Sequence, residues 1–260
     1  MRKFARRVFR AKSIPLLLSI IAVGCAAPAA YQASTGQVAV RPASSELRRQ
    51  GAAAFETYKR TKPISRDPAA RTRVFRVASR LRQVVSVPGA SWEFEVFNDN
   101  SANAFALPGG KVGINTGLLK VAVTDAQLAA VVAHEMAHVT SNHAQARVQR
   151  NQTIALGGAL LGAVLGGNQN SQQYGQVAQQ GGRILFGLPF SRSQELEADR
   201  IGTIFMARAG YDPEAAVTLW QRMEATQGNR NPEILSTHPV NKTRIQKLRE
   251  FLPVARAQMR

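Results

Sequence analysis

The chain has 260 residues, 45% of them hydrophobic, so it is long enough to bury a sizeable core in one domain. Its formal net charge of +18 favours anionic surfaces, but the aromatic content is only 7% and no nucleic-acid-recognition motif is present, which argues against a nucleic-acid-binding protein. A single cysteine excludes an intramolecular disulfide.

Residues 1–24 predict an export signal. Six basic residues lie in the first twelve positions, and an apolar run from Ile14 to Gly24 follows them. The run is shorter than the roughly 20 apolar residues that a membrane-spanning helix needs. It ends in Ala22-Val23-Gly24-Cys25, which resembles the lipobox of bacterial lipoproteins, in which the cysteine becomes lipidated. The alternative is a free or buried thiol.

The predicted location is the periplasmic face of the bacterial outer membrane, with a lipid on Cys25 as the anchor, because alanine rather than aspartate follows this cysteine. Paired arginines in the basic region leave both the general and the twin-arginine export routes open. Residues 25–45, rich in Ala, Pro, Ser and Gln, predict a flexible tether. A single domain is predicted over 46–260, beginning with helices near 46–60 and 68–86.

The segment 91–116 predicts a small sheet. Apolar and polar residues alternate over 92–97, as expected for a half-buried strand. Two further strands, 104–107 and 112–115, flank the turn Pro108-Gly109-Gly110 and indicate a hairpin. With helices on either side, the predicted fold class is α+β and mainly helical, with this sheet beside the helix described next.

The motif His134-Glu135-Met136-Ala137-His138 predicts a metal-binding helix. Thr124 and Gln127 form a capping box at its start. On a helix the two histidines lie one turn apart and project the same way, as two ligands of a tetrahedral zinc site require. Glu135 then lies beside the metal and can take a proton from its water. The segment predicts an amphipathic helix that buries one stripe, comprising Leu128, Val132, Met136 and Val139.

A chance motif on a surface helix is the alternative. Three of the four histidines of the chain lie between positions 134 and 143, which favours the metal site.

Two less regular segments follow. The apolar, glycine-spaced run 154–167 indicates close packing against another helix, or contact with the membrane. The Gln- and Asn-rich segment 168–180 predicts a mobile loop.

A second motif, which is acidic, lies in another predicted helix. This helix begins at Ser191, where Gln194 completes the cap, and ends near Gly210. Glu195 and Asp199 are four residues apart and share a face, where their charges repel each other unless a cation lies nearby. Glu195 can supply the third zinc ligand, and Asp199 can accept a hydrogen bond from the outer N–H of a ligating histidine. A solvated acidic face with arginine partners is the alternative.

Two more helices are predicted towards the C-terminus. Asp212 caps one, with Pro213 at its first position. His238-Pro239 precedes the other, which carries Arg244.

These motifs together resemble the gluzincin metallopeptidase family that contains the HtpX heat-shock protease, the CAAX prenyl protease and the β-barrel-assembly-enhancing protease. The resemblance covers roughly residues 46–253 and follows the order of the family. Within this family, the chain looks most like the short, soluble, lipoprotein-type members. The segments that carry it are Asn103 to Gly110, His134 to His138, Glu195 to Asp199, and Thr237 to Pro239.

The resemblance implies one Zn²⁺ per chain, held by His134, His138 and Glu195, with Glu135 as the general base. It also implies that Asn103, Ala104 and Phe105 contact an extended peptide at the edge of the sheet.

Two roles remain open for His238. It can fill the fourth zinc position and close the site, or, with Arg244, it can stabilise the oxyanion of the tetrahedral intermediate. The gating role is the preferred prediction.

The predicted function is a zinc-dependent endopeptidase that hydrolyses misfolded or unassembled envelope and outer-membrane proteins. The predicted partners are such unfolded substrates and a membrane reached through the lipid anchor. The alternative function is a zinc-stabilised periplasmic chaperone or assembly factor with latent peptidase activity, in which the 168–180 loop acts as a lid.

Overall fold

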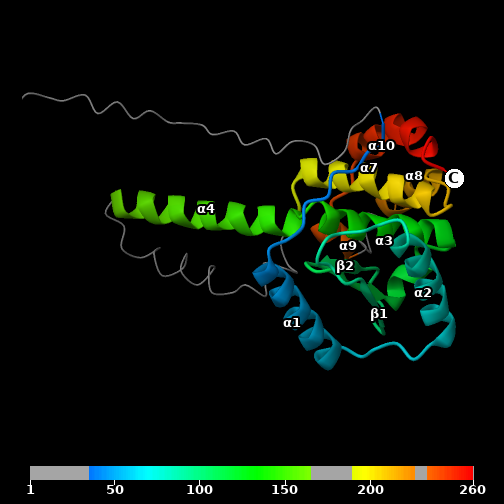
Figure 1. Cartoon of the computed structure of the whole chain (residues 1–260), viewed down its shortest axis with the longest axis horizontal. Coiled ribbons are helices and arrows are strands. Elements are labelled where there is room, and N and C mark those ends of the chain that lie inside the picture. Colours follow the sequence, from blue (N-terminus) through cyan, green and yellow to red (C-terminus); the bar gives the residue numbers. More distant parts are fainter. Residues whose placement is uncertain (1–34, 165–188, 226–232, 260) are drawn as a thin grey trace, which may run out of the picture.

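A computed structural model describes residues 35–164, 189–225 and 233–259 of the chain. The predicted signal segment, Cys25 and the 168–180 loop lie outside the described residues. The described part is mainly helical with one small sheet, which confirms the predicted fold class (Figure 1). Its elements are α1 Ser45–Thr61, α2 Pro68–Arg82, β1 Glu93–Phe97, β2 Ala104–Leu107, β3 Lys111–Asn115, the 3₁₀ helix η1 Thr116–Lys120, α3 Asp125–Thr140, α4 His143–Val164, α7 Arg192–Arg208, α8 Glu214–Ala225, α9 Ile234–Thr237 and α10 Lys242–Arg256.

The two helices that carry the site begin as the sequence predicts. Thr124 and Gln127 form a reciprocal capping box at the start of α3, and Ser191 and Gln194 form one at the start of α7. In each case the cap side chain accepts a backbone N–H, and the glutamine side chain accepts the N–H of the cap residue. These bonds satisfy amide donors that have no partner within the helix and so fix where each helix begins.

The sheet has the order β1-β3-β2, with β3 parallel to β1 and antiparallel to β2. The predicted hairpin of β2 and β3 is confirmed. Its turn contains Gly109 and Gly110 at φ angles of 89° and 84°, which glycine adopts without strain. At the centre of the sheet Gly113 lies under the ring of Phe105, where an added Cβ would fall 2.3 Å from a ring carbon. Because β2 is the last strand in this order, it lies at an edge of the sheet. The ring of Phe105 lies on the face of the sheet that α1 covers.

Helix α3 lies at the centre of the fold, and every residue from Gln127 to Thr140 is buried. The prediction of a single buried stripe was wrong, because α3 packs against β2 and β3, α2, α7 and α8, so that neighbours surround it (Figure 1). Small side chains allow this close approach. On α7, Gly202 faces the backbone of α3, where an added Cβ would lie 3.1 Å from the amide nitrogen of His134.

Helix α4 leads away from the rest of the molecule (Figure 1). The side chains of residues 154–164, and with them the predicted packing of the apolar run, lie outside what the structure describes. Among the described helices, none combines the length and hydropathy needed to cross a bilayer.

Candidate metal centre

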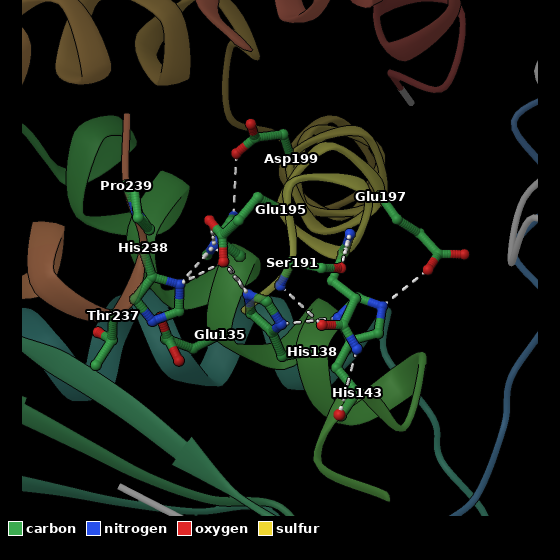
Figure 2. A network of polar contacts seen from close by, with 12 residues as sticks. Glu135, His138, His143, Ser191, Glu195, Glu197, Asp199, Thr237, His238 and Pro239 are labelled. Carbon is green, nitrogen blue, oxygen red and sulfur yellow. Dashed lines mark hydrogen bonds and ion pairs between the residues drawn. The ribbon is translucent and has the colours of Figure 1, made fainter. Parts of the chain in front are cut away.

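Four side chains from three parts of the chain converge in the interior. His134 and His138 come from α3, Glu195 comes from α7, and His238 follows α9. One potential ligand atom from each lies within 4.8 Å of all the others, and each residue is at most 4% exposed. Figure 2 shows Glu195 and His238 turned towards His138. The predicted ligands are thus brought together, and His238 joins them.

The distances within this cluster suit a tetrahedral metal ion. Ligand atoms about 2.0–2.1 Å from a tetrahedral zinc ion lie roughly 3.3–3.4 Å from one another. Here Nε2 of His134 is 3.0 Å from Nε2 of His138, 3.2 Å from Nδ1 of His238 and 3.4 Å from Oε2 of Glu195. Oε1 of Glu195 is 3.4 Å from Nε2 of His138 and 3.0 Å from Nδ1 of His238. Three imidazole nitrogens and a carboxylate facing a common centre form a donor set that Zn²⁺ prefers.

The pKa values of two of these groups favour their ligating forms. Burial holds the pKa of His138 well below its usual value, so its ring is neutral. Burial alone would raise the pKa of Glu195, but the positive charge of Arg244 and the neighbouring His238 outweigh it and hold the pKa well below the usual range. A neutral imidazole and an ionised carboxylate are the forms that bind a metal.

The second α3 histidine differs. Burial acts to lower the pKa of His134, but hydrogen bonds to Asp199 and Glu195 outweigh it and raise the pKa to about 9. Without metal, this ring is positively charged at neutral pH, and a metal ion must displace one of its two ring protons.

Asp199 and Arg244 form an ion pair behind the cluster. Oδ1 of Asp199 lies 3.1 Å from Nδ1 of His134, so it can accept the outer N–H of that ring. Two guanidinium nitrogens of Arg244 donate to the same carboxylate at 2.5 and 2.8 Å, and a third lies 2.6 Å from Oε2 of Glu195. Arg244 is only 3% exposed and stacks over Trp220 at 4.6 Å. Asp199 thus lies against the outer nitrogen of His134, and its role as the partner of a zinc ligand stays a prediction.

These contacts give Arg244 the position of a counter-ion. Its Nη1 also donates to the carbonyls of His238 and Pro239, at 3.4 and 3.1 Å. The guanidinium therefore holds the loop that carries His238 as well as Glu195 and Asp199 of α7. The role of an oxyanion donor for Arg244 stays a prediction.

Glu135 lies beside the cluster rather than within it. Its Oε1 is 3.3 Å from Nε2 of His238, and its carboxylate accepts a hydrogen bond from the backbone N–H of Ala106 on β2. Burial raises the pKa of this carboxyl, which makes it a better proton acceptor than an exposed glutamate. The side chain therefore stands between the metal ligands and the edge of the sheet.

The edge strand presents backbone groups next to Glu135. The backbone amide of Asn115 donates to the carbonyl of Asn103 at 3.0 Å, so the carbonyl of Asn103 points inward, towards β3. Because bonding alternates along an antiparallel strand, Phe105 also bonds inward, and Ala104 and Ala106 direct their N–H and C=O groups outward. Of the three predicted substrate contacts, Ala104 thus directs its backbone groups to the outer side of β2, although the residue is only 1% exposed.

The other two predicted contacts have protein partners. The side chain of Asn103 donates to Glu233 at 3.2 Å, and the ring of Phe105 packs edge-on to Tyr58 with 4.8 Å between centroids.

An apolar pocket lies beside His138, between the β2 edge and the α3–α4 corner. The ring of Phe190 forms one wall and stacks on His138 with 3.9 Å between centroids. The guanidinium of Arg147 lies over the Phe190 ring, 4.3 Å from the ring centroid. The remaining lining residues are Ala43, Ala106, Pro108, Val139, Asn142 and Ala144.

Sequence reasoning missed two residues of this centre, His143 and Glu197. The Nδ1 atoms of His143 and His138 lie 2.8 Å apart, and Nε2 of His143 lies 2.8 Å from Oε2 of Glu197. A third histidine so close to the motif, in a chain with only four, was the available signal. The direction in which the side chain of His143 points could not be predicted without knowing the turn that separates α3 from α4.

Comparison with known proteins places this site in a family. The profile of Peptidase family M48 matches residues 68–252. The chain belongs to Peptidase family M48. This result confirms the family resemblance predicted from the motifs.

Two relatives illustrate the extent of the similarity. Mitochondrial metalloendopeptidase OMA1 of Schizosaccharomyces pombe is 38% identical over 187 residues, which are 70% of this chain and 54% of that protein. The β-barrel assembly-enhancing protease of Escherichia coli K12 is 33% identical over 191 residues, which are 70% of this chain and 39% of that protein. The chain thus matches about half of the length of the first relative, and less of the second.

Proposed function

We propose that the chain is a zinc metalloendopeptidase. The observation that carries the proposal is the convergence of His134, His138 and Glu195 at tetrahedral spacing, with Glu135 beside them and the edge strand within hydrogen-bonding reach. Membership of a peptidase family and relatives named metalloendopeptidases support it. One zinc ion per chain is the expected stoichiometry.

Each residue then has a chemical task. When bound, the metal supplies Lewis acidity at the scissile carbonyl and lowers the pKa of water towards ~7. Glu135 takes the proton of the attacking water and passes it to the leaving amine. Asp199 holds the ring of His134, and Arg244 balances the charge of Asp199 and Glu195.

The proposed substrate is an extended peptide that pairs with β2. The outward N–H and C=O groups of Ala104 and the outward C=O group of Ala106 would supply the backbone hydrogen bonds. The amide of Ala106 also contacts Glu135, so a peptide on this edge would pass directly beside the proposed base. An apolar side chain of that peptide would fit the pocket between His138 and Phe190.

His238 supports a further proposal, that the enzyme is gated. Its Nδ1 faces His134 and Glu195, while its Nε2 faces Glu135. In this position the ring takes the fourth ligand site and lies against the base, so water cannot be both bound and activated. Removal of the ring from the site would open it.

The same geometry favours one alternative function. A protein that keeps His238 in the fourth position would hold zinc for stability while its peptidase activity stays latent, as in a chaperone or assembly factor. The two functions differ in whether substrate releases the ring.

The location and substrates are proposed from the sequence. The lipobox-like segment supports a lipid anchor on Cys25 and a place at the periplasmic face of the outer membrane. Misfolded or unassembled envelope proteins are the proposed substrates there. We expect Cys25→Ser to move the protein from the membrane to the soluble fraction after cell fractionation. A wild-type protein that carries no lipid and is soluble would contradict the anchor.

The deciding experiment measures zinc content and peptidase activity on one preparation. We expect about one zinc per chain and casein cleavage that a chelator stops and added zinc restores. A zinc-loaded protein without activity on casein or on unfolded outer-membrane proteins would favour the latent alternative. A protein that binds no zinc would contradict both.

A further inference from the structure

We infer that His143 and Glu197 form a hydrogen-bond chain that positions the metal-facing ring of His138. This inference rests on the proposed zinc site and assigns a task to two residues that are not among its ligands. Figure 2 shows the chain running from His138 through His143 to Glu197, on the side of α7 away from Glu195 and Asp199. His143 is only 2% exposed, and the side chain of Glu197 is 15% exposed, so water competes little for these contacts.

The direction of each hydrogen bond follows from the metal site. His138 faces the cluster with Nε2, so in a metal complex its proton must be on Nδ1. That N–H points at Nδ1 of His143, which can accept it only if the proton of His143 is on Nε2. Nε2 of His143 in turn faces an oxygen of Glu197, which accepts that proton. One arrangement of protons satisfies the whole chain, and the carboxylate selects it.

The backbone explains how His143 reaches this position. On an unbroken helix, five residues rotate a side chain by about 500°, which would leave His143 roughly 140° away from His138. Helix α3 ends at Thr140, however, and Asn142 adopts a left-handed φ of 53° before α4 begins. Asparagine tolerates this conformation better than most residues. The turn brings His143 back beneath the ring of His138, and Gln194 of α7 contacts the carbonyl of His143 at 3.4 Å.

The two α3 histidines therefore have different supports. His134 is held directly by the carboxylate of Asp199, at 3.1 Å. His138 is held by a neutral imidazole, with the carboxylate of Glu197 one residue further away. Metal-bound histidines usually donate their outer N–H to a carboxylate, a backbone carbonyl or water, and loss of such a partner typically weakens metal binding about 10–100-fold.

The test compares three variants of the full chain. His143→Leu removes both hydrogen bonds, His143→Asn keeps an acceptor near the Nδ1 position, and Glu197→Leu removes the group that selects the tautomer. Gln145→Leu, in the same turn of α4, is the matched control, because Gln145 contacts Ser44 and not the chain described here. For each protein we would measure zinc affinity by chelator competition, the visible spectrum of the Co²⁺ form, and the melting temperature without metal.

We expect His143→Leu to bind zinc about 10–100-fold more weakly and to change the Co²⁺ spectrum. His143→Asn should recover most of the affinity, Glu197→Leu should lose about tenfold, and Gln145→Leu should match the wild type. In the wild-type protein, ¹⁵N NMR should find the proton of His143 on Nε2.

Two results would overturn the inference. One is equal zinc affinity in the wild type and His143→Leu. The other is an equal loss in the Leu and Asn variants, accompanied by an equal fall in metal-free melting temperature, which would make His143 a structural contact between helices. Failure of the wild-type protein to bind zinc would instead contradict the proposed function.

Discussion

His134 and His138 are one helical turn apart on α3, yet the charge of their surroundings differs. His134 faces two carboxylates, those of Asp199 and Glu195, which Arg244 holds in place. His138 faces His143 on its outer side and stacks against Phe190. Accordingly the pKa of His134 is raised to about 9, whereas burial lowers the pKa of His138. A shared motif on one helix therefore does not make its two histidines equivalent, because the neighbouring elements set their charge.

The largest expected effects separate binding of zinc from use of zinc. Glu135→Gln should keep zinc and lose about 10²–10⁴-fold in turnover, because glutamine cannot accept the water proton. Glu195→Gln should lose zinc itself, since the charged ligand from the carboxylate side of the site is gone. Metal analysis and peptidase assays on both variants check this. Normal zinc content in the Glu195 variant would remove that residue from the ligand set.

The next comparison concerns stability on the two sides. Arg244→Leu leaves Asp199 and Glu195 buried without their counter-ion and should cost about 3–5 kcal/mol in the free energy of unfolding of the metal-free protein. Arg41→Leu removes a weaker partner of Glu197, 3.9 Å away and 29% exposed, and should cost less than about 1 kcal/mol. Urea denaturation of both variants gives the two values. Equal losses would contradict the contrast between the buried ion pair and the partly exposed one.

His238 tests whether the carboxylate side also gates the site. We expect His238→Ala to retain zinc and to raise proteolysis, because the fourth position becomes open to water. A fall of roughly 10²–10³-fold in turnover with little change in KM would instead assign the ring to transition-state stabilisation. Zinc titration and steady-state kinetics on the variant distinguish these results, and unchanged values in both would leave His238 with neither role.

The smallest effect is a pH dependence that belongs to one histidine. The pKa of His134 is raised on folding, from about 6.5 in an unfolded chain to about 9. Its contribution to the stability of the metal-free protein is thus complete below about pH 6.5 and is lost as the pH rises to about 9. Denaturation between pH 6 and 10 in the presence of chelator measures it.

Asp199→Asn is the control for this pH dependence, because it removes the carboxylate that faces Nδ1 of His134 at 3.1 Å. It should flatten the curve between pH 6.5 and 9 relative to the wild type. An unchanged slope in this variant would contradict the assignment to His134.

Much of this architecture could be predicted from local sequence. Caps at Thr124 and Ser191 depend on side chains a few residues apart, and the hairpin depends on Gly109 and Gly110. The burial of α3 on all sides could not be predicted, because periodicity shows which residues are apolar but not how many elements surround a helix.

The site shows the same limit. His134, His138 and Glu195 follow from spacing along two helices, and the structure brings them together. The partners of Arg244 and the direction of His143 depend on where one element stops and another begins. The left-handed Asn142 that redirects the chain has no signature strong enough to be recognised in advance.

Gly202 shows what the close contact of α3 and α7 demands of the sequence. It lies seven residues, or about two turns, beyond Glu195, on the same side of α7. A methyl group there would lie 3.1 Å from the amide nitrogen and 3.2 Å from Cα of His134, so the two helices would have to separate by a few tenths of an ångström. Glu195 and His134 belong to those same two helices, and their Oε2 and Nε2 atoms lie 3.4 Å apart. Because Gly202 has no side chain, α3 and α7 can approach closely enough to set the distance between Glu195 and His134. That distance in turn determines the metal–ligand bond lengths at the site.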